Sequence, residues 1–331
     1  LGTLRSRWRV RPISEEVRSY VRSGRRATAS RIELSPAVEQ RLLTGVYGAA
    51  ETAGEAASPF HWRERSCATA VRGLVDGALG GALAQALSTP APLSPREEVV
   101  RHLARVPWAA VGWTLLAGTP ADAPQSRYDA AFTPVRLQEA LDEQVLGWPD
   151  GSTRPLLAPP CLLNGAVDTA PPPEPPDASL PAGLVGLGLG LGLGLLGWRR
   201  PRAAGVVVAA AGVVGGALAS VALGLALASE LSVLRPNRNW LFLHPLLLAL
   251  VPMGVAWARG RRPAWGWPVA AGLAGLAIVG LPLALVPAWP QGDHVAFLLV
   301  VLPGLLATAW LAARRRPDGR RHYPGLRAKR F

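Results

Sequence analysis

Lysine is almost absent from this sequence of 331 residues. Arginine supplies all but one of its 35 basic residues, and Lys329 is the exception. The net charge of +13 would suit a protein that binds nucleic acid. The arginines instead gather beside long apolar segments, where a membrane topology explains them. We therefore expect no nucleic acid among the partners.

The sequence also has little from which a metal or nucleotide site could be built. It contains two cysteines, Cys67 and Cys161, and five histidines that lack the spacing of metal ligands. It has neither a phosphate-binding loop motif nor the glycine motif of dinucleotide-binding folds. The glycine-rich run at 183–197 belongs to an apolar segment. We expect no metal and no cofactor.

Acidic residues become rare after residue 180, where long apolar segments begin. Between residues 181 and 313 the acids are Glu230 and Asp293 alone. A helix of about 20 apolar residues crosses a bilayer, and five segments of roughly that length lie here. The predicted spans lie near 181–198, 204–228, 240–258, 265–289 and 295–313. The sequence therefore predicts a five-helix transmembrane bundle over 181–313.

Arginine in the loops predicts the orientation of this bundle. Three arginines follow the first span, three follow the third, and the tail 314–331 holds eight basic residues. The loop after the second span holds only Arg235 and Arg238, and the loop after the fourth span holds no arginine. Basic loops stay on the cytoplasmic side, so we expect a cytoplasmic tail and an N-terminal domain on the opposite side.

Glycine predicts how the first span packs. Gly186, Gly190 and Gly194 recur every four residues, which places them on one face of a helix. Small residues at this spacing let two transmembrane helices approach closely. We expect this face to contact a neighbouring helix.

The first 164 residues have a mixed, charged composition and predict a mainly helical domain without a convincing strand. Helix starts are expected at Ser35-Pro36, Ser94-Pro95 and Thr133-Pro134, because proline suits the first helical position and a hydroxyl before it caps the helix. Ser94 and Glu97 have the spacing of a capping box. The apolar segment from Trp108 to Leu116 is expected to be buried.

A proline-rich segment follows this domain. Residues 165–180 contain the run Pro171-Pro172-Pro173-Glu174-Pro175-Pro176, which favours an extended chain. We expect this segment to be a linker between the soluble domain and the membrane.

The segment around Cys67 is the strongest candidate for chemistry. Ser66 suits an N-cap, Cys67 would be the first helical residue, and Val71, Leu74 and Val75 would form a buried face. A cysteine at the positive end of a helix, near several arginines, favours the nucleophilic thiolate. The alternatives are a small buried cysteine and a disulfide with Cys161.

The order of these features resembles the Lnb-like family of bacterial membrane proteins, which join a periplasmic N-terminal domain to C-terminal spans. The matching segments are Ser66-Cys67-Ala68-Thr69-Ala70-Val71-Arg72, Ser94-Pro95-Arg96, Pro107-Trp108, Leu116-Ala117-Gly118, Asp122, Phe132-Thr133-Pro134-Val135-Arg136-Leu137, Asn237-Arg238-Asn239-Trp240-Leu241 with Pro245-Leu246, and Gln291. The family has asparagine in the place of Ser66. Its partner histidine lies in a Gly-His segment, which we expect upstream of Leu1.

This resemblance implies part of a papain-like thiol fold in the bacterial inner membrane. It also implies a thiol acyltransferase that N-acylates lipoproteins through a thioester, with Cys67 as the nucleophile. Membrane lipids and lipoprotein substrates would be the partners. Among the histidines of this chain, His102 is a weak candidate for the partner base, and His61 is too close in sequence to Cys67 to be a typical one.

Three residues in the membrane part are candidates for binding substrate or lipid. Asn237 and Asn239 lie in an outer loop and could bind a lipid headgroup, dock the soluble domain, or simply form a turn. His244 lies just inside the third span, where a polar side chain suggests either a role or an interfacial anchor.

Two other functions remain open from the sequence. The first is a cysteine hydrolase of the cell envelope, which would pass the acyl or peptidyl group to water instead of an amine. The second is a non-catalytic membrane protein with a structural disulfide between Cys67 and Cys161, as exported proteins often have.

Overall fold

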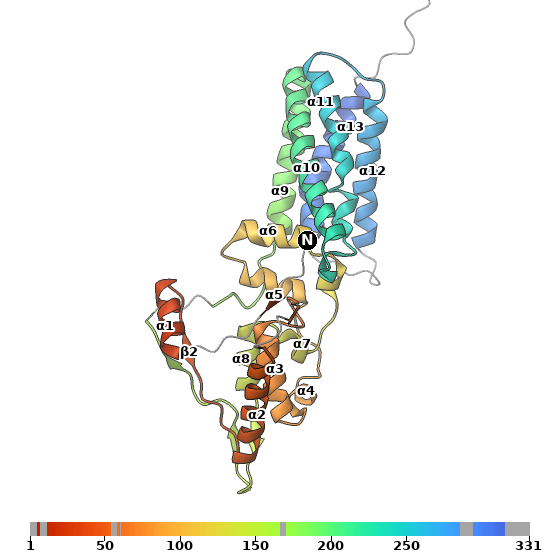
Figure 1. Ribbon diagram of the computed structural model, residues 1–331. Helices are drawn as coiled ribbons and strands as arrows, with labels where there is room; N and C mark the ends of the chain where they lie inside the picture. The colour runs from red at the N-terminus through yellow and green to blue at the C-terminus, as the bar shows by residue number, and fades with distance from the viewer. Residues whose placement is uncertain are drawn as a thin grey trace, which may run out of the picture. The chain divides into compact units, whose positions relative to one another are not determined.

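A computed structural model describes residues 5–6, 12–53, 58–59, 61–165, 170–284 and 294–314, and it is mainly helical (Figure 1). The chain forms two compact units. The first takes its residues from 1–110, 121–176 and 229–231, and the second takes the remainder. Gln291, part of the predicted fourth span (285–289) and the tail 315–331 lie outside the described residues.

The first unit is built from short helices. These are α1 (Ile13–Arg22), α2 (Pro36–Ala53), α3 (Cys67–Ala78), α4 (Ala82–Ala86), α5 (Pro95–His102), α7 (Arg127–Ala130) and α8 (Pro134–Asp142). The helix starts predicted at Pro36, Pro95 and Pro134 are confirmed. Ser94 and Glu97 form the predicted capping box, and the Thr133 hydroxyl accepts the N–H of Arg136.

The sequence analysis did not predict the short strands, of which two pairs join segments far apart in the chain and the third forms a local hairpin. β1 (Arg5–Ser6) pairs with β3 (Ser58–Pro59), β2 (Thr28–Ala29) with β6 (Cys161–Leu162), and β4 (Val145–Gly147) with β5 (Thr153–Pro155), all antiparallel. Strands of two or three residues are too short for an alternating pattern to reveal them.

The core of the first unit lies where α3, α4 and α8 meet. Its buried side chains include Val75, Leu83, Leu87, Leu141 and Leu156. Val75 is buried as expected, whereas Val71 is exposed, so the buried face of α3 is narrower than predicted. The helix instead buries Ala68, Thr69 and Ala78.

Residues 170–176 of the predicted linker belong to the first unit. The carbonyl oxygen of Pro172 accepts a hydrogen bond of 3.1 Å from Nη1 of Arg101 on α5. Residues 166–169 lie outside the described part, and the first apolar helix begins at Ser179. This bond ties the segment to α5 at Pro172.

The second unit contains the apolar helices, of which all but α11 have 19 residues or more. They are α9 (Ser179–Arg199), α10 (Pro201–Ala228), α11 (Leu250–Ala258), α12 (Gly266–Ala284) and α13 (His294–Arg314), with 3₁₀ turns η2 (Ser232–Leu234), η3 (Arg238–Leu241) and η4 (Pro245–Ala249). Among the described residues, three helices are long and apolar enough to cross a membrane: α9, α10 and α13. A fourth span is formed if the pair Ser232–Leu241 and Pro245–Ala258, bent by 41°, counts as one.

One of the five predicted spans differs from the structure. The third, 240–258, is not one continuous helix, because η3 and η4 precede α11 and Pro245 starts a new turn. The fourth, 265–289, is described as the apolar helix α12 from Gly266 to Ala284, in agreement with the prediction over those residues.

Glycines bring α9 and α13 together. Gly186 lies against the backbone of Leu299, and a Cβ atom at Gly190 would lie 2.7 Å from Cβ of Pro303. A Cβ at Gly197 would meet the side chain of Leu311. Each glycine faces a residue 113 or 114 positions later, so the two helices run parallel. The packing predicted for Gly186 and Gly190 is confirmed.

Gly194 does not share this contact. A Cβ at Gly194 would have no atom within 4 Å. The third glycine of the contact is Gly197, whereas the sequence analysis predicted Gly194.

The pair α10 and α11 also packs through glycine, in antiparallel register. Gly205 lies opposite Gly254, Gly212 opposite Leu250, and Gly216 opposite Leu248. The C-terminal ends of α9 and α11 therefore lie at the same end of the unit, and α13, parallel to α9, ends there as well (Figure 1). Arg199 and Arg200 at the end of α9, Arg259 and Arg261 after α11, and Arg314 at the end of α13 therefore lie at this end.

Substituting Gly190 tests the contact between α9 and α13. We expect Gly190→Ala to lower the stability by about 1–3 kcal/mol, because the added methyl group would force the helices apart. Gly188→Ala on the same helix meets no atom within 4 Å and should be neutral or slightly stabilising, since alanine is the better helix former. Thermal unfolding in detergent micelles measures both. Equal unfolding temperatures would contradict the packing described.

Candidate functional site

Cys67 is the first residue of α3, as predicted. The Ser66 side chain accepts the N–H of Thr69, and the Thr69 hydroxyl accepts the N–H of Ser66 at 2.8 Å, which makes a complete capping box. The capping box gives hydrogen-bond partners to backbone N–H groups at the start of the helix, and the Cys67 thiol takes no part in it. Cys67 is exposed and carries a free thiol. It is therefore accessible to a substrate.

The loop before Cys67 is fixed by contacts with the segment that leads into α8. The Ser66 hydroxyl donates to the carbonyl oxygen of Phe132 at 3.2 Å. The rings of Trp62 and Phe132 pack edge to face with centroids 5.4 Å apart. Both contacts hold the start of α3 in place beside an aromatic surface.

The second cysteine does not pair with the first. Cys161 lies on β6, where it is opposite Ala29 of β2, and its thiol is free and exposed. The structure thus contains no Cys67–Cys161 disulfide.

The described histidines have other partners than Cys67. Nδ1 of His102 lies 2.7 Å from the carbonyl oxygen of Glu98 and 3.5 Å from its carboxylate. Because a carbonyl oxygen only accepts, Nδ1 of His102 carries a proton. Nδ1 of His61 accepts the N–H of Glu64 at 3.0 Å. In the part of the chain that the structure describes, no histidine forms a hydrogen bond with the Cys67 thiol.

Arg72, one of the arginines near Cys67 in the sequence, has other partners. Arg72 reaches from α3 to the carbonyl oxygen of Tyr128, and its guanidinium lies 4.0 Å from the centre of the Tyr128 ring. The Tyr128 hydroxyl donates to Asp76 at 3.2 Å. Burial, with the charge of Asp76, raises the pKa of Tyr128 in spite of Arg72. Arg72 thus joins α3 to α7 rather than facing the thiol.

The buried carboxylate of Glu98 is the centre of a larger polar cluster. Arg101 donates two hydrogen bonds to it, of 2.7 and 2.8 Å, and Nε of Arg136 donates another of 2.9 Å. The Thr133 hydroxyl donates a fourth, of 3.2 Å. Burial alone would raise the pKa of Glu98, but these hydrogen bonds and charges outweigh it and hold the pKa below the usual range. Glu98 is therefore ionised and fully paired.

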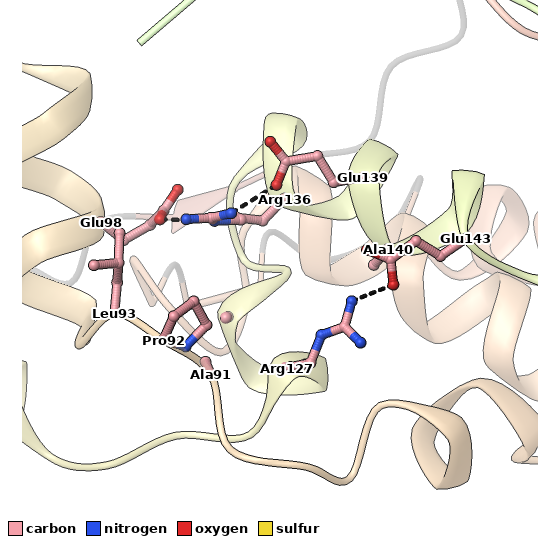
Figure 2. Close-up of a pocket in the computed structure, with 10 residues that line it drawn as sticks. Ala91, Pro92, Leu93, Glu98, Arg127, Arg136, Glu139, Ala140 and Glu143 are labelled. Atoms are coloured by element: carbon pink, nitrogen blue, oxygen red, sulfur yellow. Dashed lines mark hydrogen bonds and ion pairs between the residues drawn. The ribbon is translucent and has the colours of Figure 1, made fainter. Parts of the chain in front are cut away.

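A pocket of about 220 Å³ opens beside this cluster (Figure 2). Its charged lining residues pair with one another: Arg136 with Glu98 and Glu139, and Arg127 with Glu143. It contains neither a nucleophile nor a histidine. The pocket has the character of a structural ion-pair network and offers no evident chemistry.

The two asparagines of the second unit hold the end of another helix. α6 (Pro107–Leu116) begins in the first unit, but its residues from 111 onward belong to the second. Nδ2 of Asn237 donates to the carbonyl oxygens of Leu115 and Leu116 at 2.9 and 3.0 Å. Nδ2 of Asn239 donates to those of Thr114 and Leu115 at 2.9 and 3.0 Å. Both side chains cap α6 at its C-terminus.

The backbone strengthens this junction. Gly118 donates its N–H to Val233 at 2.7 Å, and Thr119 donates to Pro236 at 2.8 Å. A side chain at Gly118 would collide with the carbonyl oxygen of Pro236. The segment 111–120 is therefore part of the second unit, although the sequence analysis placed it in the soluble domain.

His244 also caps a helical turn. Its Nδ1 accepts the N–H of Leu246 at 3.1 Å at the start of η4. Asn237, Asn239 and His244, predicted to bind substrate or lipid, all have described structural partners.

The comparisons with known proteins give no relative. No protein-family model matches the chain, and no curated protein and no solved structure is significantly similar to it. The resemblance to the Lnb-like family therefore stays a prediction.

Sequence reasoning missed the roles of Glu98 and Asp122. Arg96 of α5 forms a buried, bidentate ion pair with Asp122, at distances of 2.8 to 3.1 Å. A signal existed, because α5 is short and carries four charged residues besides His102 on a segment of eight. Not all of them can face water on so short a helix.

Replacing Glu98 tests the cluster. We expect Glu98→Gln to lower the free energy of unfolding by about 3 kcal/mol near neutral pH, because it leaves the buried Arg101 without its counter-charge and Arg136 with Glu139 alone. A carboxylate whose pKa is depressed in the folded state stabilises above the unfolded pKa of about 4.3, and this contribution is lost as the pH falls through the folded value. The difference between variant and parent should therefore shrink in acid.

Denaturant unfolding of the full chain in micelles, near pH 7 and near pH 3, measures this difference. Glu139→Gln is the matched control, since Glu139 pairs with the same Arg136 but lies half-exposed, and it should cost less than about 1 kcal/mol. Equal losses for the two variants would contradict the assignment.

Replacing Asn239 distinguishes a helix cap from a lipid site. We expect Asn239→Ala to lower stability by about 1–3 kcal/mol, because the carbonyl oxygen of Thr114 loses its Asn239 donor and that of Leu115 keeps only Asn237. Asn239→Asp should cost more, since a carboxylate can only accept. Thermal unfolding in micelles is the measurement. Unchanged stability with weakened phospholipid binding would favour the lipid site instead.

Proposed function

We propose that this chain is part of a membrane thiol acyltransferase of the Lnb type, with Cys67 as its nucleophile. The observation that carries the proposal is the exposed, free thiol at the first position of a fully capped helix, in a chain with apolar helices long enough to cross a membrane. The helix N-terminus favours the thiolate, which is the reactive form.

The reaction has two steps. The Cys67 thiolate attacks an ester carbonyl of a lipid or of a diacylglyceryl group, forming a thioester while the deacylated donor leaves as an alcohol after taking up a proton. The amino group of a lipoprotein's N-terminal cysteine then attacks the thioester, forming an amide and losing a proton, and the thiol is regenerated. Both substrates are anchored in lipid, which suits a membrane-bound enzyme.

A general base must take the thiol proton, and in the family that the chain resembles this base is a histidine of a Gly-His segment. His102 and His61 do not compete for this role, since His102 is held against Glu98 and His61 against Glu64.

Some of the segments on which the resemblance rests also contact one another. Ser66 bonds to Phe132, Arg96 pairs with Asp122, and Asn237 bonds to Leu116. These contacts are compatible with the proposal that the segments form one functional arrangement.

The finer features of the resemblance belong to the same proposal. These are a papain-like arrangement in the first unit, five spans in the second, a periplasmic N-terminal domain and a cytoplasmic tail in the bacterial inner membrane. The gathering of arginines at one end of the second unit supports this topology.

The test is replacement of Cys67 in the full-length protein. We expect Cys67→Ala to abolish N-acylation of a reporter lipoprotein, because no thioester can form, with the acyl state read by mass spectrometry. Cys161→Ser is the matched control, since Cys161 is also free and exposed, and it should keep full activity.

Other outcomes would count against the proposal. An unchanged acyl state in Cys67→Ala would refute it. Release of free fatty acid without an acylated amine would assign the protein to the hydrolases. Alkylation of both cysteines only after reduction would indicate a disulfide and remove the nucleophile.

A further inference from the structure

An apolar groove runs along the outside of α9 and α13 in the second unit. It has a volume of about 550 Å³. The lining residues are apolar throughout, and the largest are Leu187, Leu191, Leu195 and Trp198 on α9 with Leu306 and Trp310 on α13.

Gly194 is the cause of this groove. The helices touch at Gly190 and again at Gly197, but between these contacts a Cβ at Gly194 would meet no atom within 4 Å. The missing side chain therefore leaves a furrow between two tight contacts. Several side chains along it, among them Leu191 and Trp198, are largely exposed.

The groove cannot stay empty in a bilayer. α9 and α13 are both long and apolar enough to span a membrane, so its walls would face hydrocarbon. A void would forfeit the dispersion contacts of the lining side chains. The apolar group available at this position is the acyl chain of a lipid.

One end of the groove is positively charged. It ends at Trp198 and Trp310, and the parallel register of the helices places Arg199 and Arg200 level with Arg314. The guanidinium of Arg314 lies 4.1 Å from the centre of the Trp310 ring. Within the described ranges, no carboxylate pairs with these three exposed arginines. Basic groups beside transmembrane helices attract anionic headgroups.

We infer that the groove binds one acyl chain of an anionic phospholipid, with its phosphate held by Arg200 and Arg314. The shape and the charge agree on this occupant: the furrow is as apolar as hydrocarbon, and the cations lie where the chain would join its headgroup. This site is independent of Cys67 and of the proposed reaction.

Native mass spectrometry of the purified full chain in detergent tests the site, with phosphatidylglycerol as the probe and phosphatidylcholine of the same chain length for comparison. We expect one phosphatidylglycerol bound per chain, more tightly than phosphatidylcholine. Gly194→Leu fills the furrow and should weaken phosphatidylglycerol binding about tenfold or more. Gly192→Leu is the matched control, because position 192 is equally open but does not line the groove, and it should bind normally.

The headgroup is tested by the double variant Arg200→Gln and Arg314→Gln. It should lose the preference for phosphatidylglycerol while still binding both lipids through the groove. Ala307→Phe obstructs the groove from the α13 side and should weaken binding as Gly194→Leu does, so a folding defect in one variant leaves the other informative.

Three results would overturn the inference. Equal phosphatidylglycerol binding by Gly194→Leu and Gly192→Leu would show that the acyl chain does not occupy the groove. Equal binding of phosphatidylglycerol and phosphatidylcholine by the parent chain would show that the arginines do not select an anionic headgroup. A dimer that dissociates in Gly194→Leu would show that a second copy of the chain covers the groove.

Discussion

Every polar group withdrawn from water needs a partner, and this requirement organises both units. In the first unit, Glu98 receives four hydrogen bonds, and Arg96 pairs with Asp122. An uncompensated buried charge costs several kcal/mol, so these pairs fix how α5 meets α8 and the segment before α7. In the second unit the same requirement acts on backbone carbonyls. Asn237 and Asn239 satisfy the last turn of α6, and this joins segment 111–120 to residues that follow more than a hundred positions later.

The long apolar helices need a different source of stability, because they carry few polar groups and have no hydrophobic advantage over lipid. Glycine supplies it by permitting contact between backbones. Gly186 and Gly190 bring α9 onto α13, and Gly205 and Gly254 bring α10 onto α11. Where a glycine does not touch a neighbour, as at Gly194, the same lack of a side chain leaves the groove. One residue type thus creates both the contacts and the gap between them.

Sequence reasoning succeeded where the signal is local. The caps at Ser66 and Ser94 were predicted because each needs only residues within one turn, and both are confirmed. It failed where the partner lies far away in the chain. The segment from Trp108 to Leu116 was expected to be buried because it is apolar, yet Trp108 is 78% exposed on α6. Asn237 and Asn239 were predicted to bind a ligand, because a sequence does not show that their partners are carbonyl oxygens of residues 114–116, more than a hundred positions earlier.

The same local capping makes Cys67 a good subject for experiment. Its helix is held by the side chains of Ser66 and Thr69 and by the bond from Ser66 to Phe132, none of which involves the thiol. The sulfur atom has no hydrogen-bond partner among the described residues, and the residue is exposed, so its removal takes away almost no folding energy. A functional loss in Cys67→Ala would therefore report chemistry and not unfolding. A thiol so little used by the fold is either a nucleophile or a residue without a role, and replacing it separates these two cases.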